Sequence, residues 1–403
     1  MSGTLHVVGA GLAGLSCAVA GAKAGWRVAL HEAAPQAGGR CRSFRCDKLD
    51  RVIDNGTHLL LGANRHALSF AAAIGGTEAL DPAQPVFPFL DLGSGRHWSV
   101  TPAKLSSGIL ETAAALGLPW VPAEQSVSRR LGRTRSFATL WEPLCEAMLN
   151  TGAGHASAKL FGCVLREVLL GGKSAMRPFI ARGGLSSVFA APAIATLAAH
   201  GAQITFRRRL IGITDNALAF DDRTIPVAKD DRVVLALPPW AVTGLLPEVG
   251  ELPTQAIINA HFRLGHAPIL PGGQPFLGLV GGVAQWLFVR EDVASVTISA
   301  AGHLLDNDAE DLARTIWRDV APVLRLDAAL VPPARIIKER RATLAHTPDV
   351  VRRRPGHATK APWLWLAGDW LASPWPCTIE AAVASGLGAA RAALGRDDLT
   401  FAC

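Results

Sequence analysis

The stretch Gly9-Ala10-Gly11-Leu12-Ala13-Gly14 follows an apolar run, Leu5 to Val8, and opens a segment of small residues that extends to about Ala24. A second apolar run, Arg27 to Leu30, comes next. This order of strand, glycine-rich turn, helix and strand predicts a βαβ unit. Its glycines allow a tight turn and let the backbone approach a pyrophosphate, which the free N–H groups of the helix N-terminus would bind.

Glu32 follows the second predicted strand. An acid at this place accepts a hydrogen bond from a ribose 2′-hydroxyl and disfavours a 2′-phosphate. The G-x-G-x-x-G pattern alone is weak evidence in a chain with 40 glycines, but the strand, the helix and the acid all occur where the pattern requires them. We therefore predict a dinucleotide site that includes Gly9, Gly11, Gly14 and Glu32.

Further motifs indicate which dinucleotide is bound. Gly38-Gly39-Arg40 follows the second strand, and Leu366-Ala367-Gly368-Asp369 precedes Thr378-Ile379-Glu380 near the end of the chain. With the first motif, they resemble the flavin-containing amine oxidase and phytoene desaturase superfamily. The resemblance implies FAD as the cofactor. It also implies a further set of cofactor contacts: Gly39, Arg40, Asn55, Gly56, Leu210, Gly368, Asp369, Thr378 and Ile379.

The same resemblance implies a role for several of these residues. Arg40 is expected near the phosphates, and Gly368 and Asp369 near the pyrophosphate and the ribityl chain. The backbone of Leu210 is expected at the adenine. Glu380 has two interpretations, a group close to the flavin or an acid that stabilises the first turn of the last helix.

The positions of the motifs predict an α/β fold with a discontinuous cofactor domain. We expect a Rossmann-type FAD-binding domain, of the glutathione reductase or amine oxidase type, with an inserted α+β substrate domain. The cofactor domain is expected to comprise residues 1–80, 196–240 and 335–403. The substrate domain is expected to comprise residues 81–195, mainly helical, and residues 241–334, an antiparallel sheet.

Within these parts, apolar patterns predict individual elements. Strands are expected at Ile204–Phe206 and Val233–Leu237 in the cofactor domain. Helices are expected around Phe137–Leu149 and Leu160–Leu170. The uncharged window Ala267–Val289 is interrupted by prolines and glycines, and therefore predicts a β-hairpin and not a membrane span.

Segments outside the nucleotide motifs resemble a narrower family, the squalene-associated FAD-dependent desaturases, which are understood as hydroxysqualene dehydroxylases of hopanoid biosynthesis. The segments are Asp54–Gly62 (DNGTHLLLG), Trp141–Cys145 (WEPLC), Arg182–Ser186 (RGGLS), Gly278–Trp286 (GLVGGVAQW) and Ala367–Trp370 (AGDW). The resemblance covers nearly the whole chain. It implies reductive removal of an allylic hydroxyl from an apolar C30 isoprenoid, giving squalene, with reduced FAD as the hydride donor.

This chemistry requires an acid that protonates the leaving hydroxyl and a slot that excludes water. The chain has no tyrosine, so carboxylates and histidines remain as candidates. Asp54 and His58 are predicted as catalytic residues because in relatives their loop passes beside the isoalloxazine. Each also has a structural interpretation, in which Asp54 holds a turn with Asn55 and Gly56, and His58 donates to a backbone carbonyl.

Cys377 raises the question of a covalent flavin. Its place after the Gly-Asp motif differs from the attachment site in amine oxidases that bind flavin covalently, and non-covalent FAD is therefore expected. The chain contains seven cysteines, but none form a C-x-x-C pair, and no metal site is predicted.

Two other classes of function remain open. An isoprenoid desaturase of the carotenoid type, or an amine oxidase, would use the same FAD site with electrons moving in the opposite direction. The absence of tyrosine counts against the aromatic cage of many amine oxidases. A non-catalytic isoprenoid-binding escort protein would share the fold without FAD, but the intact phosphate loop, Glu32 and Gly368-Asp369 count against it.

Composition suggests where the protein works. The chain is 49% hydrophobic with a formal net charge of +7, and arginine clusters at 129–135, 207–209 and 352–354 suit an anionic membrane surface, although solvated arginine is the simpler interpretation. The first strand begins close to Met1 with no basic segment before it, which predicts the cytoplasm, with peripheral contact at the inner face of the membrane. No second dinucleotide motif identifies the electron donor, and nucleic acid is not an expected partner.

Overall fold

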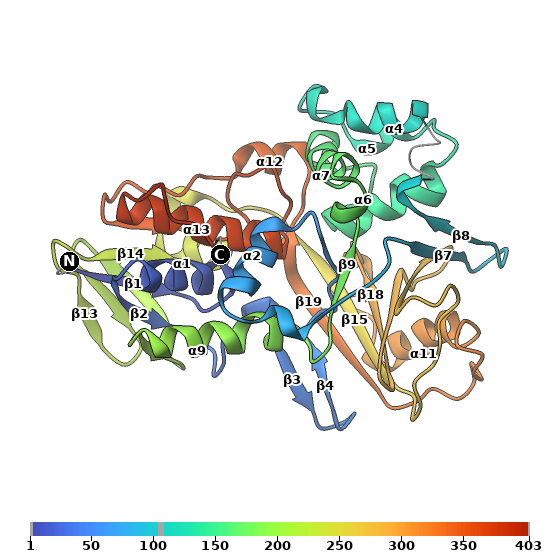
Figure 1. Ribbon diagram of the computed structural model, residues 1–403, viewed down its shortest axis with the longest axis horizontal. Helices are drawn as coiled ribbons and strands as arrows, with labels where there is room; N and C mark the ends of the chain where they lie inside the picture. Colours follow the sequence, from blue (N-terminus) through green and yellow to red (C-terminus); the bar gives the residue numbers. More distant parts are fainter. Residues whose placement is uncertain (1–2, 104–108, 402–403) are drawn as a thin grey trace.

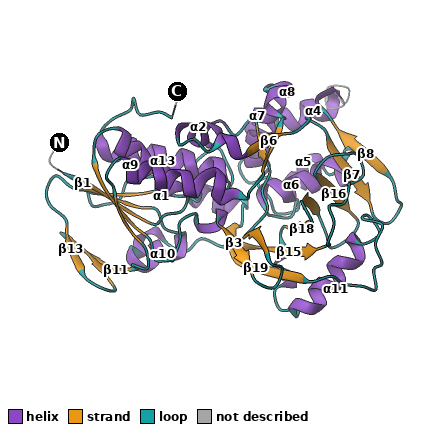
Figure 2. Cartoon of the chain, turned by 60° about the horizontal axis from the view of Figure 1, so that its bottom comes forward, coloured by secondary structure: helices purple, strands orange, loops and turns teal. Residues whose placement is uncertain are grey.

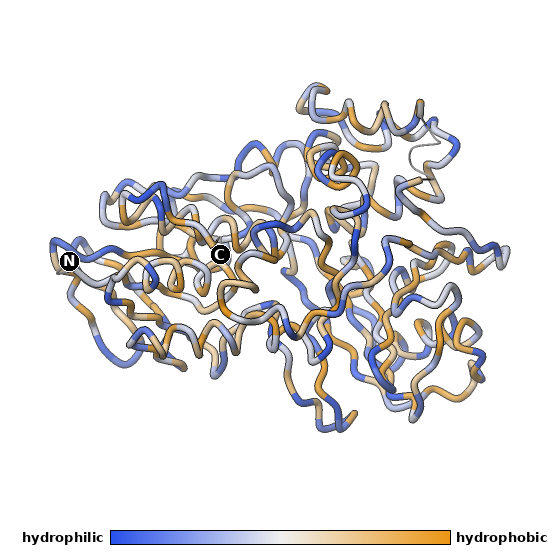
Figure 3. Tube along the Cα trace, in the orientation of Figure 1, coloured by the Kyte–Doolittle hydropathy of each residue, from blue (hydrophilic) through white to orange (hydrophobic). Residues whose placement is uncertain are grey.

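The computed structural model describes residues 3–103 and 109–401. The chain forms two lobes side by side, and both ends of the chain lie on the same lobe (Figure 1). Hydrophilic residues occur mainly at bends and outer loops, and apolar residues along the central helices and strands (Figure 3). Among the described helices, none has both the length and the apolar composition needed to cross a bilayer.

A five-stranded parallel sheet forms the centre of the lobe that carries the termini. Its strand order is β10-β2-β1-β14-β20. The strands are β10 (Gln203–Thr205), β2 (Arg27–His31), β1 (Thr4–Val8), β14 (Arg232–Leu235) and β20 (Leu364–Leu366). A parallel sheet is buried on both faces, which explains the nearly continuous apolar runs that the sequence shows here.

Helices cover one face of this sheet and a smaller sheet covers the other. The first face is covered by α1 (Leu12–Lys23), α13 (Ile379–Leu394), α9 (Ala191–Ala199) and α2 (Arg65–Ala73). The second is covered by α10 (Pro239–Leu245) and by the antiparallel strands β11 (Leu210–Thr214), β12 (Ala217–Phe220) and β13 (Thr224–Pro226). This lobe is therefore the Rossmann-type domain that the glycine motif predicts.

Small residues let α1 and α13 approach closely. A Cβ on Gly386 would lie 2.1 Å from the carbonyl oxygen of Ala13 and 2.0 Å from Oγ of Ser16. A Cβ on Gly21 would lie 2.4 Å from the side chain of Leu5, in β1. Residues 12–22 of α1 are all buried, so this helix forms the centre of the lobe.

A seven-stranded sheet forms the other lobe. Its order is β19-β15-β18-β17-β16-β7-β8, with antiparallel pairing except between β16 and β7. The strands are β19 (Ala334–Leu344), β15 (Thr254–Arg263), β18 (Val293–Ile298), β17 (Trp286–Arg290), β16 (Phe276–Val280), β7 (Phe87–Asp91) and β8 (His97–Val100). The sheet lies between α11 (Ala309–Val320) and a group of helices that includes α5 and α6 (Figure 2).

That helical group comes from the middle of the chain. It comprises α4 (Ile109–Leu116), a 3-10 helix at Leu118–Trp120, α5 (Val127–Leu131), a π-helix at Phe137–Trp141, α6 (Glu142–Leu149), α7 (Ala158–Leu170) and α8 (Gly172–Ala175). Ser157 caps α7, because its side chain accepts a hydrogen bond from the Leu160 N–H at 3.3 Å. Helix α12 (Pro348–Arg353) lies beside this group.

Short elements connect the two lobes. They are the hairpin β3 (Ser43–Cys46) and β4 (Arg51–Asp54), and a three-stranded sheet of β5 (Leu60–Leu61), β9 (Pro178–Ala181) and β6 (Leu80–Pro82). Three further 3-10 turns are Thr77–Ala79, Pro247–Val249 and Ala301–Leu304. The chain therefore crosses between the lobes several times.

The structure confirms the predicted fold class and most of the predicted elements. Strands β10 and β14 belong to the cofactor lobe, the uncharged window contains the antiparallel pair β16 and β17, and the two predicted helices are present. The substrate lobe lies between these pieces in the sequence, as an inserted domain does.

The domain boundaries differ from the prediction at three places. The antiparallel sheet extends to Leu344, beyond the predicted boundary at 334, because β19 pairs with β15. The π-helix Ser186–Ala190 packs in the cofactor lobe, before the predicted start at 196. The segment 81–195, predicted as mainly helical, also supplies β7 and β8 to the sheet. Pairing and packing between distant segments decide these boundaries, and no local pattern marks them.

Candidate active site

The glycine loop leaves the N-terminus of α1 open. Gly11 precedes the helix with extended backbone, no side chain caps the helix, and its first turn has no acid. A Cβ on Gly14 would lie 1.8 Å from the carbonyl oxygen of Gly9, whereas a Cβ on Gly11 would meet nothing within 4 Å. Gly9 itself has φ +103°, a conformation that favours glycine. The loop is therefore tightly built on one side and open on the side where an anion would bind.

Glu32 lies at the edge of this loop. Its carboxylate accepts hydrogen bonds from the N–H of Ala10 at 2.6 Å and of Ala34 at 2.7 Å. The carbonyl of Glu32 accepts from the N–H of Arg208 at 2.9 Å, which brings the start of β11 at Leu210 close to it. The acid and Leu210, far apart in sequence, therefore meet at one end of the parallel sheet, as the dinucleotide prediction requires.

The GGR segment lies directly over the glycine loop. The N–H of Gly38 donates to the carbonyl of Ala10 at 2.8 Å, and a Cβ on Gly39 would lie 3.1 Å from Cα of Gly11. Arg40 continues from here toward the C-terminal motif. Two backbone segments thus approach each other closely, and a side chain on Gly39 would obstruct this approach.

Arg40 and Asp369 connect the two ends of the cofactor motif. Nη2 of Arg40 donates to both carboxylate oxygens of Asp369, at 2.7 and 2.8 Å, and Nη1 donates to the carbonyl of Ala342. Asp369 is buried, whereas 38% of the Arg40 side chain is accessible. Burial lowers the pKa of Arg40, but the charge and hydrogen bond of Asp369 raise that pKa more, so the guanidinium is firmly protonated.

The loop after Gly368 is held by Arg354, a residue that the sequence analysis assigned to a surface cluster. Arg354 is buried, and its guanidinium donates to the carbonyls of Asp369, Trp370, Ser373 and Trp375 and to Oγ of Ser373. Burial lowers the pKa of Arg354. Its expected contact with an anionic surface is therefore wrong: the arginine satisfies backbone carbonyls inside the protein.

Thr378 and Glu380 act at two different helix ends. Oγ1 of Thr378 accepts from the N–H of Ala381 at 3.3 Å and so caps α13. The buried carboxylate of Glu380 accepts from the N–H groups of His66 and Ala67, at 3.0 and 2.9 Å, in the first turn of α2. It also contacts Nδ1 of His66 at 2.7 Å. Glu380 lies in the first turn of the last helix, as one of its two predicted interpretations states, and it also caps the neighbouring helix α2, which neither interpretation included.

Asp54 is held by three partners. Its carboxylate accepts from Oγ of Ser43 at 2.6 Å, from the N–H of Leu185 at 2.9 Å and from Arg290 Nη1 at 2.8 Å. Asp54 is buried, and its hydrogen-bonding capacity is used by these three partners, one of them an arginine. The geometry supports a role in positioning the loop, which was the structural alternative for this residue.

His58 lies four residues further along the same loop. Its Nδ1 is 2.7 Å from the carbonyl of Gly56, so Nδ1 carries the hydrogen and Nε2 is free to accept. Desolvation by the surrounding protein lowers the pKa of His58, although the side chain is exposed and the Gly56 carbonyl and Asp54 oppose the shift. A neutral imidazole with this tautomer presents a lone pair and no proton at Nε2, which does not suit the predicted acid.

The loop of Asp54 to His58 rests on the seven-stranded sheet through a row of polar groups. Nδ2 of Asn55 donates to Glu339 at 3.2 Å, and Nδ2 of Asn259 donates to the carbonyl of Asn55 at 3.3 Å. Oγ1 of Thr297 donates to Oδ1 of Asn259 at 2.9 Å. A Cβ on Gly56 would lie 3.3 Å from Nδ2 of Asn259, so the loop contacts the sheet directly.

Beyond this polar row, the same region is apolar. The residues after His58 join a cluster built from the edge of the sheet and from the helices above it: Leu59, Leu61, Ala63, Phe87, Phe89, Trp98, Val100, Leu140, Leu144, Val168, Ala175, Met176, Ile180, Phe276, Val280, Trp286 and Phe288. The cluster is rich in aromatic side chains. It places an apolar environment next to the loop that the sequence assigns to the reaction.

His346 and Cys377 are joined by a hydrogen bond that no sequence motif predicts. Nδ1 of His346 donates to the carbonyl of Leu149 at 2.7 Å, and Nε2 accepts from the N–H of Cys377 at 2.9 Å. Burial lowers the pKa of His346 to about 4 and raises the pKa of the Cys377 thiol to about 12. A neutral histidine thus fixes the backbone just before α13, beside an unreactive thiol.

Together these residues fit a bound dinucleotide. The structure brings Gly9, Gly11, Gly14, Glu32, Gly39, Arg40, Leu210, Gly368 and Asp369 to the same edge of the parallel sheet. An uncapped helix N-terminus and a protonated arginine suit a pyrophosphate, and Glu32 suits a ribose. Asn55 and Gly56 lie on the loop after β4, which contacts the second lobe, and Thr378 and Ile379 lie at the start of α13.

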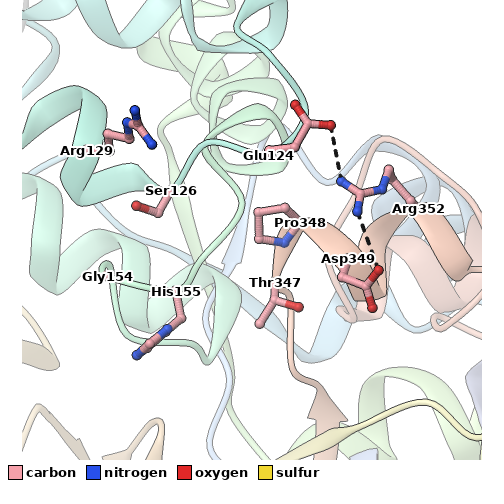
Figure 4. Close-up of a pocket in the computed structure, with 9 residues that line it drawn as sticks. All are labelled: Glu124, Ser126, Arg129, Gly154, His155, Thr347, Pro348, Asp349 and Arg352. Carbon is pink, nitrogen blue, oxygen red and sulfur yellow. Dashed lines mark hydrogen bonds and ion pairs between the residues drawn. The ribbon is translucent and has the colours of Figure 1, made fainter.

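A separate pocket of about 410 Å³ lies near α5 and α12. Its residues are polar, and Arg352 lies between Glu124 and Asp349, 3.4 Å from a carboxylate oxygen of each (Figure 4). None of the predicted site residues lines it. This pocket does not suit an apolar substrate, and we assign no function to it.

Comparison with known sequences agrees with the geometry. The family model described as flavin containing amine oxidoreductase matches residues 12–394. A hydroxysqualene dehydroxylase of Sinorhizobium fredii (strain NBRC 101917 / NGR234) is 40% identical over 98% of this chain and 99% of its own length. A hydroxysqualene dehydroxylase of Rhodopseudomonas palustris (strain ATCC BAA-98 / CGA009) is 40% identical over 96% of this chain and 97% of its own.

Solved structures share the fold at low identity. Cyclohexylamine oxidase from Brevibacterium oxydans IH-35A matches with a TM-score of 0.74 and 15% identity, over 97% of this chain and 98% of that one. Putrescine oxidase bound to putrescine matches with a TM-score of 0.71 and 17% identity, over 98% and 99%. The chain is an FAD-dependent oxidoreductase of the flavin-containing amine oxidoreductase family, and within it belongs to the hydroxysqualene dehydroxylases.

Proposed function

We propose that the protein converts hydroxysqualene to squalene by reductive dehydroxylation, in squalene and hopanoid biosynthesis. Relatives named for this activity align with nearly the whole chain at 37–40% identity, which supports the proposal most directly. The aromatic and aliphatic cluster beside the His58 loop agrees with an apolar C30 substrate. Amine recognition has no comparable support, since the chain has no tyrosine.

In this reaction the reduced flavin would supply a hydride to the carbon that loses oxygen. The glycine loop, Glu32 and Arg40 would hold the cofactor's phosphates and ribose. The apolar cluster would bind the isoprenoid and exclude water, which would otherwise trap an allylic cation. Asp54 would keep the loop in place through Arg290 and Ser43, without exchanging a proton with the substrate.

We also propose that the flavin is bound without a covalent link. The Cys377 thiol is buried and its pKa is raised to about 12, so it does not form the thiolate that attacks a flavin at neutral pH. Denaturation with acid followed by filtration tests this. Yellow flavin in the filtrate supports the proposal, and flavin retained with the polypeptide contradicts it.

Peripheral contact with an anionic bilayer is a further part of the proposal. Leu110, Trp120 and Leu170 are 86%, 68% and 62% exposed on helices that pack together, and Arg166 lies over the Trp120 ring at 4.7 Å. Residues 109–177 contain eight Lys and Arg against five Glu. Apolar and aromatic side chains within a basic surface suit the inner face of a cell membrane.

Vesicle flotation tests this contact. We expect binding to phosphatidylglycerol vesicles to fall at high salt and in a variant with Leu110, Trp120 and Leu170 all changed to serine. Ile269→Ser is the matched control, because Ile269 is 88% exposed in the loop between β15 and β16, outside these helices. Equal binding by both variants would contradict the assignment of this surface.

The reaction itself is tested by comparing two redox states. Purified protein is incubated anaerobically with hydroxysqualene, once with oxidised flavin and once after reduction with dithionite. Squalene formed only in the reduced sample supports reductive dehydroxylation. Dehydrogenated isoprenoid formed only in the oxidised sample would favour a desaturase instead.

A further inference from the structure

Two sequence stretches typical of the narrower family meet at a second pocket, which is distinct from the glycine loop. The pocket has a volume of about 180 Å³ and lies between α6 and the turn that joins β16 to β17. WEPLC supplies Glu142, and the GLVGGVAQW stretch supplies Gln285 and Trp286. Glu146, one helical turn after Glu142, also lines it. Two carboxyl groups thus face a pocket at the edge of the apolar cluster.

Gln285 determines how Glu146 is oriented. The amide oxygen of Gln285 accepts from the N–H of Ser299 at 2.7 Å, so its Nε2 points away from that N–H and donates to Oε2 of Glu146 at 3.1 Å. Within residues 3–103 and 109–401, Oε1 of Glu146 has no hydrogen-bond partner. A proton on this carboxyl would therefore be carried by Oε1, the oxygen that is not engaged by Gln285.

The surroundings favour the protonated form of Glu146. Burial raises the pKa of Glu146, and the carboxylate of Glu142 raises it further, while His303 opposes both. A second carboxylate nearby is a common means of holding an acid protonated near neutral pH. Asp54, by contrast, is paired with Arg290.

The pocket lies close to the loop that contacts the cofactor. Thr297 bonds to Asn259, which bonds to the carbonyl of Asn55. In the sheet, Thr297 is directly opposite Trp286, the neighbour of Gln285. Trp286 lies on β17, which is two strands away from β15, the strand of Asn259. Adjacent strands are about 5 Å apart, so the edge of the pocket is about 10 Å from β15, measured across the strands. Because the acid and the hydride act on the same carbon, the proposal requires the hydroxyl-bearing carbon to lie between this pocket and the loop of Asp54 to His58.

We propose that Glu146 is the catalytic acid that protonates the leaving hydroxyl, on the basis of its place in this pocket and its contact with Gln285; the assignment rests on the proposed reaction. The carboxyl proton passes from Glu146 to the hydroxyl oxygen. The C–O bond then breaks, its electron pair stays on oxygen, and water leaves. A bound reduced flavin would supply the hydride that the allylic carbon accepts, and the Glu146 carboxylate accepts a hydrogen bond from Gln285.

Glu146→Gln tests the assignment in a single anaerobic turnover with reduced enzyme. Loss of a positioned acid costs about 10²–10⁴-fold in rate, and we expect a loss in this range with flavin content and Tm unchanged. Glu146→Asp should recover part of the rate. The control is Glu310→Gln, an exposed residue on α11, which should match the wild type.

A substrate analogue separates acid catalysis from a structural effect. The allylic fluoride that corresponds to hydroxysqualene depends less on protonation when it leaves. Glu146→Gln should therefore lose much less rate with the fluoride than with the alcohol. Equal losses with both substrates would contradict the proposal, because a misplaced substrate would affect both.

Two further readouts test the assignment, one by spectroscopy without turnover and one by the pH dependence of the rate. Infrared difference spectra on squalene binding should contain a protonated carboxyl band in the wild type that disappears in Glu146→Gln. Glu142→Gln should move the alkaline limb of the rate profile to lower pH, since removal of the Glu142 charge lowers the pKa of Glu146. If Glu146→Gln does not retain flavin, this pH shift decides the question.

The outcomes distinguish the two levels of the proposal. If wild-type enzyme produces no squalene, the proposed reaction fails, and the acid assignment with it. If the wild type is active and Glu146→Gln keeps its rate with the alcohol, only the assignment of Glu146 fails. An unchanged pH profile in Glu142→Gln would likewise overturn it.

Discussion

Nη2 of Arg40 bonds to both carboxylate oxygens of Asp369, at 2.7 and 2.8 Å, although the two residues are 329 positions apart. This pair joins the segment after the glycine loop to the segment before α13. We expect Asp369→Asn and Arg40→Ala to lower the flavin content of the purified protein. Loss of one partner of a buried ion pair costs about 3–5 kcal/mol in the free energy of unfolding. We expect a smaller loss here, because the Arg40 side chain is partly accessible to solvent.

The measurement is the ratio of flavin to protein absorbance, together with urea denaturation. Arg182→Ala is the control, because its pair with Asp81 is exposed. Full flavin content in Asp369→Asn would show that the pair is not needed to close the site.

Glu380 caps a helix other than its own. Glu380→Ala leaves the N–H groups of His66 and Ala67 without their acceptor, and we expect a loss of about 1–3 kcal/mol in the free energy of unfolding. The control is Glu78→Ala, at an exposed site, for which a change within about 0.5 kcal/mol is expected. Similar stability of both variants would argue against the cap.

Asp54→Asn separates the structural interpretation of this residue from the catalytic one. The variant leaves Arg290 without its carboxylate, so a loss of about 3 kcal/mol in the free energy of unfolding is expected. The pH dependence of the rate in the folded variant should match the wild type. If Asp54→Asn is as stable as the wild type but loses the acid-dependent step, Asp54 is the proton donor after all.

Two buried histidines make the protein sensitive to acid. Burial lowers the pKa of His261 and of His346 to about 4. The unfolded chain binds protons on both below about pH 6.5, whereas the folded protein does not, so stability is full above 6.5 and falls as the pH drops toward 4. Each contributes about 3 kcal/mol to the loss, from about 1.4 kcal/mol for each pH unit.

Urea denaturation at several pH values measures this loss. His346→Asn should flatten the decline between pH 6.5 and 4, although its stability at neutral pH will be lower because the bonds to Leu149 and Cys377 change. The same slope in both proteins would show that His346 does not titrate as the structure indicates.

The cofactor half of the site could be predicted from the sequence because its motifs are local. The glycine loop, Glu32 and the GGR segment consist of particular residue types at short, fixed spacings, and a sequence motif records such spacings directly. The predicted βαβ unit and the hairpin of β16 and β17 follow from apolar patterns for the same reason.

Contacts between distant segments could not be predicted in this way. Arg354 appears in a run of three arginines that suggests a surface, but the fold buries it among backbone carbonyls. Glu380 caps α2, and β19 extends the substrate sheet, through partners that no local pattern reveals. The pocket of Glu146 forms only when two family-like stretches, more than a hundred residues apart, come together.

The central claim is that electrons move from the flavin to hydroxysqualene. The most direct measurement is an anaerobic single turnover in which photoreduced enzyme is mixed with hydroxysqualene, flavin reoxidation is followed by absorbance, and squalene is extracted and quantified by mass spectrometry. We predict that squalene appears at the rate of flavin reoxidation, with one molecule formed for each flavin oxidised. A flavin that stays reduced while the lipid is recovered unchanged would contradict the account.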